Sequence, residues 1–383
     1  MAEETEVQRL HAEHTGVLEL QGTFAIKDPA DLGKAYTPGV AALAKDIQAH
    51  PEDQAKYTMS CKLIPVITDG TAVLGLGNIG PGAGLPIVEG KALIYKSFAN
   101  VDAIPRALNQ VSVDDLVKTI ETMAPSFAGI HLEDIAAPRC FELVERLSKD
   151  LDIPVYHDDQ TGTAIVVLAG LMNAAKVVGK KLTDLKVVLT GVGASGLATA
   201  NLLLAAGIKQ QTLVDIHGVV RSNDDRYNDF QRNLADRVQE VAGDSLDEVI
   251  EDADAFIGLS AANVLSKEQV QKMAKEPIVF ALANPLPEFD PEEAAAAGVA
   301  VMATGSSQWP NQVNNVLAFP GLFKGLLASG LKHVDSQLQI KVSQGLADLV
   351  PEPRADKIVP AVFDQGVVDA VTKAVLDYAR KGE

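Results

Sequence analysis

Residues 187–215 read VVLTGVGASGLATANLLLAAGIKQQTLVD, and this stretch decides the fold. A short apolar strand is expected over 187–189, a glycine turn follows it, and residues 197–206 predict a helix before a second strand at 213–214. Strand, turn, helix and strand in this order form a βαβ unit, whose two strands run parallel in one sheet. The stretch therefore predicts a doubly wound, Rossmann-like α/β domain.

The glycine turn has the spacing of a dinucleotide cradle, G-x-G-x-x-G, between a strand and a helix whose N-terminus can receive a pyrophosphate. We expect it to bind the cofactor through Gly191, Gly193, Ala194, Ser195 and Gly196. Asp215 follows Gly196 by 19 residues, at the end of the next strand, where a ribose hydroxyl is held. A carboxylate there repels a 2′-phosphate, which favours NAD over NADP. A glycine turn that serves packing alone is the alternative.

A second match to the same pattern occurs at Gly75, Gly77 and Gly80. Residues 81–86, which follow it, contain two prolines and two glycines, so no regular helix is expected after this match. It predicts a structural or substrate-facing loop and no phosphate site.

The segments on both sides extend the α/β pattern. Apolar strands at 255–257, 278–281 and 299–301 alternate with helical stretches at 266–275 and 291–297, which predicts one parallel sheet of five or six strands. Upstream, strands near 64–68 and 129–132 and helices near 112–123 and 139–149 predict a separate α/β domain. We expect an N-terminal domain over 1–155 and a dinucleotide-binding domain over 156–383. A helix pair broken at Pro360 is expected over 356–380.

Composition excludes several classes of protein. The chain has 383 residues and a formal net charge of −18, which repels nucleic acid and anionic lipid surfaces. Two cysteines are too few for a disulfide framework or a zinc cage. The longest apolar run, 164–172, is too short to span a membrane, and the first residues do not resemble a signal peptide. A cytoplasmic protein with no membrane or nucleic-acid partner is expected.

Two acidic pairs follow strands of the N-terminal half: Glu133–Asp134 and Asp158–Asp159. Adjacent carboxylates repel each other unless a cation compensates them, and an all-oxygen ligand set suits Mg²⁺ or Mn²⁺. Solvated surface pairs are the alternative at this point. His157, beside the second pair, is expected to be structural.

Several other polar residues have two interpretations each. Lys91 lies among apolar residues, where it is either a lysine whose stem packs along the surface or a general base. Tyr36 is either a packing tyrosine or an acid. Four asparagines are candidates for hydrogen bonds to a carboxylate or carboxamide, with turn formation as the alternative: Asn284, Asn311, Asn314 and Asn315.

Taken together, the segments resemble the malic enzyme family in its short bacterial form, over nearly the whole chain and in order. The resemblance is carried by seven blocks, which are AYTPGVA (35–41), ITDGTAVLGLGNIGPGAGLPIVEGKA (67–92), LEDIAAPRCF (132–141), HDDQTGTA (157–164), TGVGASG (190–196), ANPLPE (283–288) and PNQVNNVLAFPG (310–321). Seven blocks in sequence are far more specific than any one of them.

The resemblance implies roles for individual residues. Glu133, Asp134 and Asp159 are similar to the family's ligands of Mn²⁺ or Mg²⁺, with Asp158 nearby. Lys91 is similar to its base and Tyr36 to its proton donor. Asn284, Asn314 and Asn315 match substrate-binding positions, and Asn284 also lies near the cofactor.

The reaction that the resemblance implies is the oxidative decarboxylation of (S)-malate to pyruvate and CO₂ with reduction of NAD, NADP being possible. Lys91 removes the 2-hydroxyl proton as C2 passes hydride to the nicotinamide. The metal stabilises the enolate left when oxaloacetate loses CO₂, and Tyr36 protonates C3. The resemblance also implies a homodimer or higher homo-oligomer.

Three positions depart from patterns in the family. Ala72 stands where larger members carry a carboxylate-binding arginine, Thr161 where many short members have histidine, and 306–309 (SSQW) where they have an Arg-Ser-Asp-Phe stretch. The departures at Thr161 and 306–309 motivate one alternative, a metal-dependent oxaloacetate decarboxylase without net redox chemistry. A non-enzymatic nucleotide-sensing protein on the same scaffold is a third hypothesis.

Overall fold

The computed structural model describes residues 5–73, 75–238 and 241–381. Its N-terminal half is built on a parallel four-stranded sheet in the order β2-β1-β3-β4. The strands are β1 (Leu63–Thr68), β2 (Asp102–Ala107), β3 (Ile130–Glu133) and β4 (Val155–His157). The helices between them are α5 (Gly80–Ile94), α6 (Val113–Met123) and α7 (Arg139–Asp150). Because all four strands are parallel, their carboxyl ends lie along one edge of the sheet.

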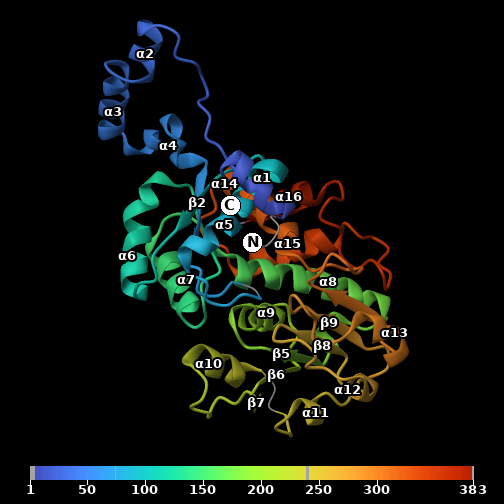
Figure 1. Ribbon diagram of the computed structural model, residues 1–383. Helices are drawn as coiled ribbons and strands as arrows, with labels where there is room; N and C mark the ends of the chain where they lie inside the picture. The colour runs from blue at the N-terminus through green and yellow to red at the C-terminus, as the bar shows by residue number, and fades with distance from the viewer. Residues whose placement is uncertain (1–4, 74, 239–240, 382–383) are drawn as a thin grey trace.

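The second half is built on a six-stranded sheet in the order β10-β9-β8-β5-β6-β7 (Figure 1). Its strands are β5 (Val187–Thr190), β6 (Gln211–Asp215), β7 (Gly218–Val219), β8 (Ala255–Gly258), β9 (Ile278–Ala281) and β10 (Val301–Thr304). Its helices are α9 (Ala194–Ala205), α10 (Asp229–Arg237), α11 (Leu246–Val249), α12 (Lys267–Lys272) and α13 (Ala294–Ala297). The strands β6 and β8 flank β5 on opposite sides, so the order of the strands reverses at β5, which is where doubly wound sheets bind their ligands.

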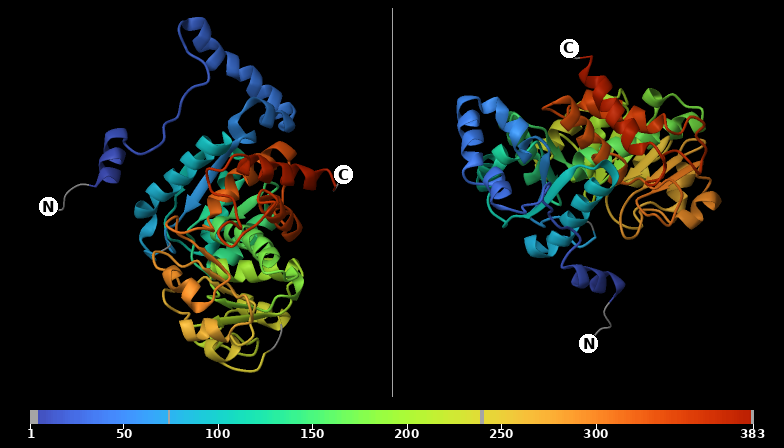
Figure 2. Two further views of the ribbon diagram at one scale, coloured as in Figure 1. Left: turned by 90° about the vertical axis from the view of Figure 1, so that its right-hand side faces the viewer. Right: turned by 90° about the horizontal axis from the view of Figure 1, so that it is seen from above.

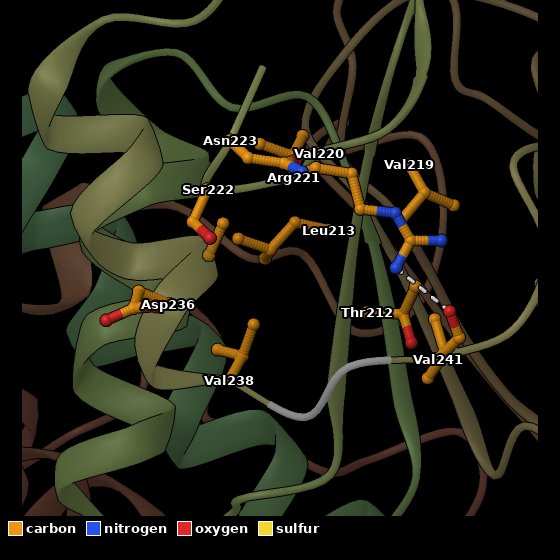
Figure 3. Close-up of a pocket in the computed structure, with 11 residues that line it drawn as sticks. Thr212, Leu213, Val219, Val220, Arg221, Ser222, Asn223, Asp236, Val238 and Val241 are labelled. Atoms are coloured by element: carbon orange, nitrogen blue, oxygen red, sulfur yellow. Dashed lines mark hydrogen bonds between the residues drawn. The ribbon is translucent and has the colours of Figure 1, made fainter.

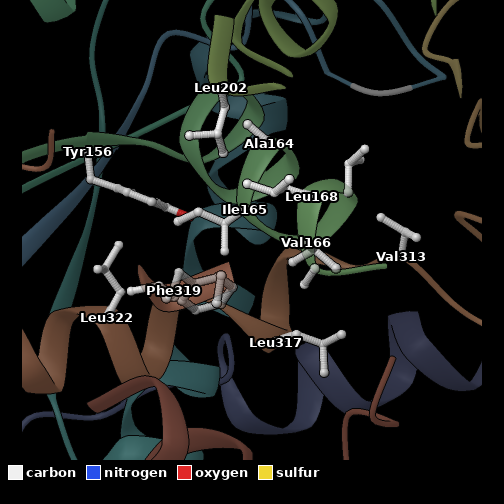
Figure 4. Packing of buried hydrophobic residues seen from close by; sticks show 14 of the residues in the cluster. Tyr156, Ala164, Ile165, Val166, Leu168, Leu202, Val313, Leu317, Phe319 and Leu322 are labelled. Atoms are coloured by element: carbon white, nitrogen blue, oxygen red, sulfur yellow. The ribbon is translucent and has the colours of Figure 1, made fainter. Parts of the chain in front are cut away.

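Helix α8 (Thr163–Val177) joins the two halves. Every residue from Ala164 to Ala175 is buried, which explains the long apolar run of the sequence. The helix packs against α9 and α15 (Ser336–Ala347). Figure 4 shows Ile165, Tyr156 and Phe319, which come from different segments, lying close together in this core.

The chain ends by returning to its N-terminal half. Helix α14 (Phe319–Ser329) contacts the turn that follows α5 and also packs on α16 (Val367–Ala379), so residues beyond 156 complete the core of the first sheet. Strand β4 itself spans the expected domain boundary. The division of the chain at residue 155 stays a prediction.

An N-terminal arm extends away from both sheets (Figures 1 and 2). It carries α1 (Glu6–His14), α2 (Pro29–Ala35), α3 (Gly39–Ala49) and α4 (Gln54–Tyr57). None of the residues in these four helices is buried. Such an arm lacks a core of its own within this chain.

Four expectations from the sequence were wrong in detail. The second sheet is not wholly parallel, because β7 pairs antiparallel with β6 as a short hairpin. Strand β10 begins at Val301, later than expected. Only α16 forms in the last segment, in place of a helix pair, since residues 356–366 follow turns without a helix. Helix α5 forms despite its prolines and glycines.

Helix α5 tolerates those residues for identifiable reasons. Pro81 stands in the first turn, where a missing N–H costs no intrahelical hydrogen bond. Gly84 is buried, and a Cβ there would lie 3.3 Å from the Thr68 side chain, so the glycine allows the helix to approach β1 closely. Tertiary packing overrides the low helix propensity. Among the described residues, no helix is both long and apolar enough to cross a membrane.

Candidate active site

The acidic residues of the first half meet at the carboxyl edge of the four-stranded sheet. Thr68 of β1 pairs with Glu133 of β3, and Leu132 pairs with His157 of β4. The residues that follow these positions, Asp134 and Asp158, therefore leave the sheet side by side. Parallel pairing alone brings the two acidic pairs of the sequence together.

Three carboxylates form a compact cluster. Oxygen atoms of Glu133, Asp134 and Asp159 all lie within 4.8 Å of one another. The Asp134 backbone N–H donates to Asp159 Oδ2 at 3.2 Å, and Asp134 adopts a left-handed backbone with φ +54°, which a residue with a short polar side chain tolerates. The structure brings together the three residues that the sequence nominated as metal ligands.

Burial makes this cluster unfavourable without a cation. Loss of hydration, followed by the charge of Glu133, raises the pKa of Asp134 to about 7 and that of Asp159 to about 7. Loss of hydration also raises the pKa of Glu133. Carboxyls that resist ionisation in this way accept a divalent cation readily, because the cation supplies the missing charge. The donor set, three carboxylates without sulfur, fits Mg²⁺ or Mn²⁺.

Lys91 of α5 reaches into the same cluster. Its Nζ lies 3.2 Å from Glu133 Oε1, donates to Asp158, and lies 4.8 Å from the centre of the Phe319 ring. Burial alone lowers the pKa of Lys91, but the Asp158 and Glu133 carboxylates outweigh it and raise that pKa above its usual value. Lys91 is a cation in the metal-free chain.

Asp158 is held by Lys91 and by two further donors. The Tyr156 hydroxyl donates to Oδ1 at 2.5 Å, and the Asn315 amide donates to Oδ2 at 2.9 Å. Burial raises the pKa of Asp158, but Lys91 outweighs it and lowers the pKa to about 2. A Cβ at position 162 would lie 2.4 Å from the Tyr156 hydroxyl, so only glycine fits there. Asp158 is thus engaged by the lysine, whereas Asp159 faces the other acids.

The sequence reasoning missed two residues of the site, His131 and Tyr95. His131 Nε2 lies 2.7 Å from Glu133 Oε2, and His131 Nδ1 lies 2.8 Å from the Tyr95 hydroxyl. Burial lowers the pKa of His131 to about 3, so the imidazole is neutral. The available signal was the period of two in a strand, which places residues 131 and 133 on one face of β3.

The glycine loop after β5 has the geometry of a phosphate cradle. Gly191 has φ +89°, and a Cβ there would lie 2.3 Å from the Leu259 carbonyl oxygen. A Cβ at Gly196 would lie 1.7 Å from the Gly191 oxygen, whereas one at Gly193 would meet no atom within 4 Å. Gly193 is the N-cap residue of α9 and has no side chain that could bond the first N–H groups of the helix. The helix therefore begins, with the N–H groups of Ala194 and Ser195, next to unfilled space. A pyrophosphate fits this arrangement.

Asp215 ends β6 beside that cradle. Its Oδ1 accepts from the His217 backbone N–H at 2.7 Å and from the Tyr227 hydroxyl at 2.8 Å. Two donors on one oxygen fix the orientation of the carboxylate.

The asparagines divide into two groups. Asn311 is buried and bonds the backbone of Met302, Ala355 and Ile358, so it is structural. Asn314 accepts from the Val316 N–H, while Asn315 accepts from Thr163 at 3.1 Å in addition to bonding Asp158. Asn284 follows β9, and the first glycine loop approaches it, since a Cβ at Gly75 would lie 3.4 Å from the Asn284 oxygen. The loop after β1 therefore lies against the segment that follows β9, and its role as a structural or substrate-facing loop stays a prediction.

Comparisons with known proteins decide the family. The model of the malic enzyme NAD-binding domain matches residues 160–380, and the model of the malic enzyme N-terminal domain matches residues 19–112 and 104–148. The chain belongs to the malic enzyme family. The resemblance stated from seven sequence blocks is confirmed.

Individual malic enzymes cover nearly all of the chain. The bifunctional malic/malolactic enzyme of Bacillus subtilis is 48% identical over 97% of this chain and 91% of its own length. The NAD-dependent malic enzyme of Geobacillus stearothermophilus is 46% identical over 95% of this chain and 77% of its own. The crystal structure of the Thermotoga maritima NAD-dependent malic enzyme superposes with a TM-score of 0.94 at 40% identity, covering 97% of this chain and 99% of that one. These matches confirm the α/β fold class, a malic-enzyme N-terminal domain followed by a Rossmann-like domain.

One residue expected in a malic enzyme site is not brought to it. Tyr36 follows α2 on the N-terminal arm, where it is 68% exposed, and the arm projects away from the sheet that carries Lys91 (Figures 1 and 2). Within one chain, the nominated acid and base lie apart.

The three departures from malic enzyme patterns lie at different places. The Ala72 N–H donates to the Asp134 carbonyl oxygen at 3.0 Å, inside the site. Thr161 lines a cavity of about 510 Å³ between α7, α9 and α15. Ser306 and Trp309 line another, of about 340 Å³, beyond β9 and β10.

A further cavity, of about 200 Å³, lies between β6 and α10 (Figure 3). Arg221 lines it, but its guanidinium donates to the Val241 carbonyl oxygen at 2.9 Å and to the Gly243 carbonyl oxygen at 2.6 Å. This cation is therefore engaged by backbone. None of the nominated site residues lines the cavity.

Proposed function

We propose that the chain catalyses the divalent-metal-dependent oxidative decarboxylation of (S)-malate to pyruvate and CO₂ with reduction of NAD. The family and its relatives support malate oxidation with NAD or NADP as the function. The metal and base assignments are supported by one observation: Lys91 contacts Glu133, which forms a cluster with Asp134 and Asp159 at one edge of the first sheet. A general base beside a carboxylate metal centre is what a 2-hydroxy acid requires.

The metal assignment rests on the fit of the donor set. Glu133, Asp134 and Asp159 would hold Mg²⁺ or Mn²⁺, whose positive charge supplies Lewis-acid stabilisation of a developing enolate. Asp158 would remain with Lys91, because three neighbours already bind both of its oxygens. The cluster is also where a chain of charge −18 can bind a dicarboxylate.

Lys91 is the proposed base for the 2-hydroxyl proton. In the metal-free chain it is a cation, since Asp158 and Glu133 raise its pKa. Its proton becomes easier to lose when the charge of Glu133 is shared with a bound cation, because part of the attraction that raises the pKa is then cancelled. Lys91 therefore acts as a base only in the loaded site. Asn315 and Asp158 keep its Nζ at the sheet edge.

Asn284, Asn314 and Asn315 are the proposed substrate-binding amides. Asn315 already touches Asp158 and Thr163, so it has a fixed orientation beside Lys91. Asn284 lies where the first glycine loop approaches β9, between the two sheets. An amide there can reach either the substrate or the nicotinamide carboxamide.

NAD is the proposed cofactor in preference to NADP. The cradle of Gly191, Gly193 and Gly196 supports a pyrophosphate, and Asp215 is fixed by Tyr227 and the His217 N–H. A fixed carboxylate accepts hydrogen bonds from a ribose diol and repels a 2′-phosphate.

We also propose that Tyr36 donates its proton in the site of a second copy, within a homo-oligomer. The arm that carries it has no buried residue in its helices and exposes large apolar side chains, among them Phe24, Ile26 and Leu32. Exposed apolar segments of this kind are stabilised by contact with another surface. The arm of one copy can then complete the Lys91 site of another.

The proposed function is tested with L-malate, Mn²⁺ and either NAD or NADP. Reduced cofactor, pyruvate and lactate are measured together, with oxaloacetate as substrate in a parallel reaction. We expect equal amounts of reduced cofactor and pyruvate, no lactate, and a higher kcat/KM with NAD. Pyruvate from oxaloacetate without any cofactor reduction by malate would favour the decarboxylase alternative, and lactate as the main product would favour a malolactic activity.

A further inference from the structure

His131 lies in β3 two residues before Glu133, on the same face of the sheet. It is fully buried, and each ring nitrogen has a hydrogen-bond partner. Nε2 lies 2.7 Å from Glu133 Oε2, and Nδ1 lies 2.8 Å from the Tyr95 hydroxyl. The imidazole therefore connects a nominated metal ligand to a buried phenol.

The chemistry of the partners fixes which nitrogen carries the proton. A carboxylate that binds a cation is ionised and can only accept hydrogen bonds, so His131 Nε2 must carry the hydrogen that faces Glu133. Nδ1 of a neutral ring is then an acceptor, and the Tyr95 hydroxyl is placed to donate to it. Tyr95 thus selects the Nε2–H tautomer of His131.

The ring is also fixed in orientation by aromatic neighbours. The His131 ring centre lies 5.2 Å from that of Tyr156 and 5.8 Å from that of Phe319, with the Phe319 plane nearly perpendicular to it. Phe323 lies parallel to it within 28° at 6.2 Å. Because α14 supplies both phenylalanines, a helix from the C-terminal half packs against a histidine of the N-terminal sheet.

This arrangement determines how Glu133 presents its oxygens. Its Oε2 is occupied by His131, and its Oε1 lies 3.2 Å from Lys91 Nζ, so Oε1 is the oxygen left to meet a cation. His157 gives Asp159 no equivalent support, because its Nδ1 lies 3.8 Å from Asp159 Oδ2, beyond hydrogen-bond distance.

We propose that His131 is a positioning residue, which holds Glu133 in the rotamer that offers Oε1 to the metal, and that Tyr95 sets the tautomer this requires. The inference rests on the proposed function, since it takes Glu133 as a metal ligand. Partners of this kind typically change metal affinity by about 10- to 100-fold when they are removed.

The test is a Mn²⁺ titration of the full chain by calorimetry, with no substrate or cofactor present. His131→Leu removes the donor, while His131→Gln keeps an amide that can donate to Glu133 and accept from Tyr95. Phe323→Leu is the matched control, because it disturbs the same aromatic cluster without touching the hydrogen bond. Asp159→Asn reports whether the titrated site is the acid cluster.

We expect His131→Leu to raise the Mn²⁺ Kd by about 10- to 100-fold, and His131→Gln and Phe323→Leu to leave it within about three-fold. Tyr95→Phe should raise the Kd by about three-fold or more alone and add nothing in the His131→Leu background. An unchanged Kd in His131→Leu, or an equal loss in Phe323→Leu, overturns the positioning role.

Three further outcomes separate a failure of this inference from a failure of the proposed metal centre. If His131→Leu does not fold, Tyr95→Phe and His131→Gln decide, and an unchanged Kd in Tyr95→Phe rejects the proposal. If the wild-type chain binds no Mn²⁺, or Asp159→Asn binds it as tightly as the wild type, the metal centre itself is wrong and the inference falls with it. A wild type that binds Mn²⁺ through Asp159, with His131→Leu unchanged, rejects the inference alone.

Discussion

The acid cluster should release protons when it binds a metal ion. Burial, followed by the charge of Glu133, raises the pKa of both Asp134 and Asp159 to about 7. Each carboxyl is then about 90% protonated at pH 6 and about 10% protonated at pH 8. A metal ion requires both in the ionised form, so on Mn²⁺ binding the two aspartates together should release about 1.8 protons at pH 6 and about 0.2 at pH 8. Glu133, whose pKa burial also raises, adds to this release.

The same pKa values give the pH dependence of affinity and stability. The apparent Mn²⁺ Kd should be at least about 70-fold higher at pH 6 than at pH 7.5, because the protons of the two aspartates compete with the metal and that of Glu133 competes in addition. In the unfolded chain these carboxyls ionise near pH 4, so the folded, metal-free chain binds more protons between about pH 4 and pH 7. Its free energy of unfolding therefore falls over that window as pH rises, and the increase in Tm caused by Mn²⁺ grows.

The assay is calorimetric titration with MnCl₂ at pH 6 and pH 8, each in two buffers of different ionisation enthalpy, from which the number of released protons follows. Asp159→Asn is the control, and it should release about one proton fewer at pH 6 than the wild type. Release of fewer than about 0.5 protons by the wild type at pH 6 would refute the account of the cluster.

Three further predictions concern the oligomer and the cofactor site. A mixture of Tyr36→Phe and Lys91→Ala chains, refolded or coexpressed, should recover about a quarter of wild-type activity if the arm acts in a second copy of a dimer, whereas action within one chain recovers none. Gly196→Ala should lower the free energy of unfolding by about 1–3 kcal/mol in thermal unfolding, since its Cβ would overlap backbone. Gly193→Ala should keep the Tm and raise the NAD Kd. Equal Tm values for the two variants would contradict the loop geometry. Asp215→Ala should shift the ratio of kcat/KM for NAD over NADP toward NADP by about 10-fold, and an unchanged ratio would remove Asp215 from cofactor selection.

The second sheet was predictable because its signals are local. Strand, glycine turn and helix over 187–205 follow one another with regular spacing, and the tight contact of Gly196 is with Gly191 in the same stretch. Helix α5 was not predictable from propensity, because Gly84 is required by the close approach of β1, a contact between segments distant in sequence. The arm was also missed, since the sequence of α1 to α4 does not indicate that none of the residues in these helices is buried.

The candidate site likewise combines residues that the sequence indicated with residues that only distant contacts bring into place. The acidic pairs stand out in the sequence, and parallel pairing of β3 and β4 is enough to bring them together. His131 and Tyr95 carry no such signal, because a lone buried histidine is more often structural than functional. Their connection to Glu133 depends on Tyr95, in the turn that follows α5, meeting His131 of β3, a contact between segments distant in sequence. Asn311 shows the reverse case, a residue in a family-like block whose hydrogen bonds are all to backbone.

The central claim is that three buried carboxylates at the edge of the first sheet form the metal centre of this malic enzyme chain. Anomalous diffraction from crystals grown with MnCl₂ tests it most directly. The account predicts one strong peak bonded to oxygens of Glu133, Asp134 and Asp159, with Asp158 still paired to Lys91. A peak at other residues, or no peak at a metal concentration that supports malate oxidation, would contradict it.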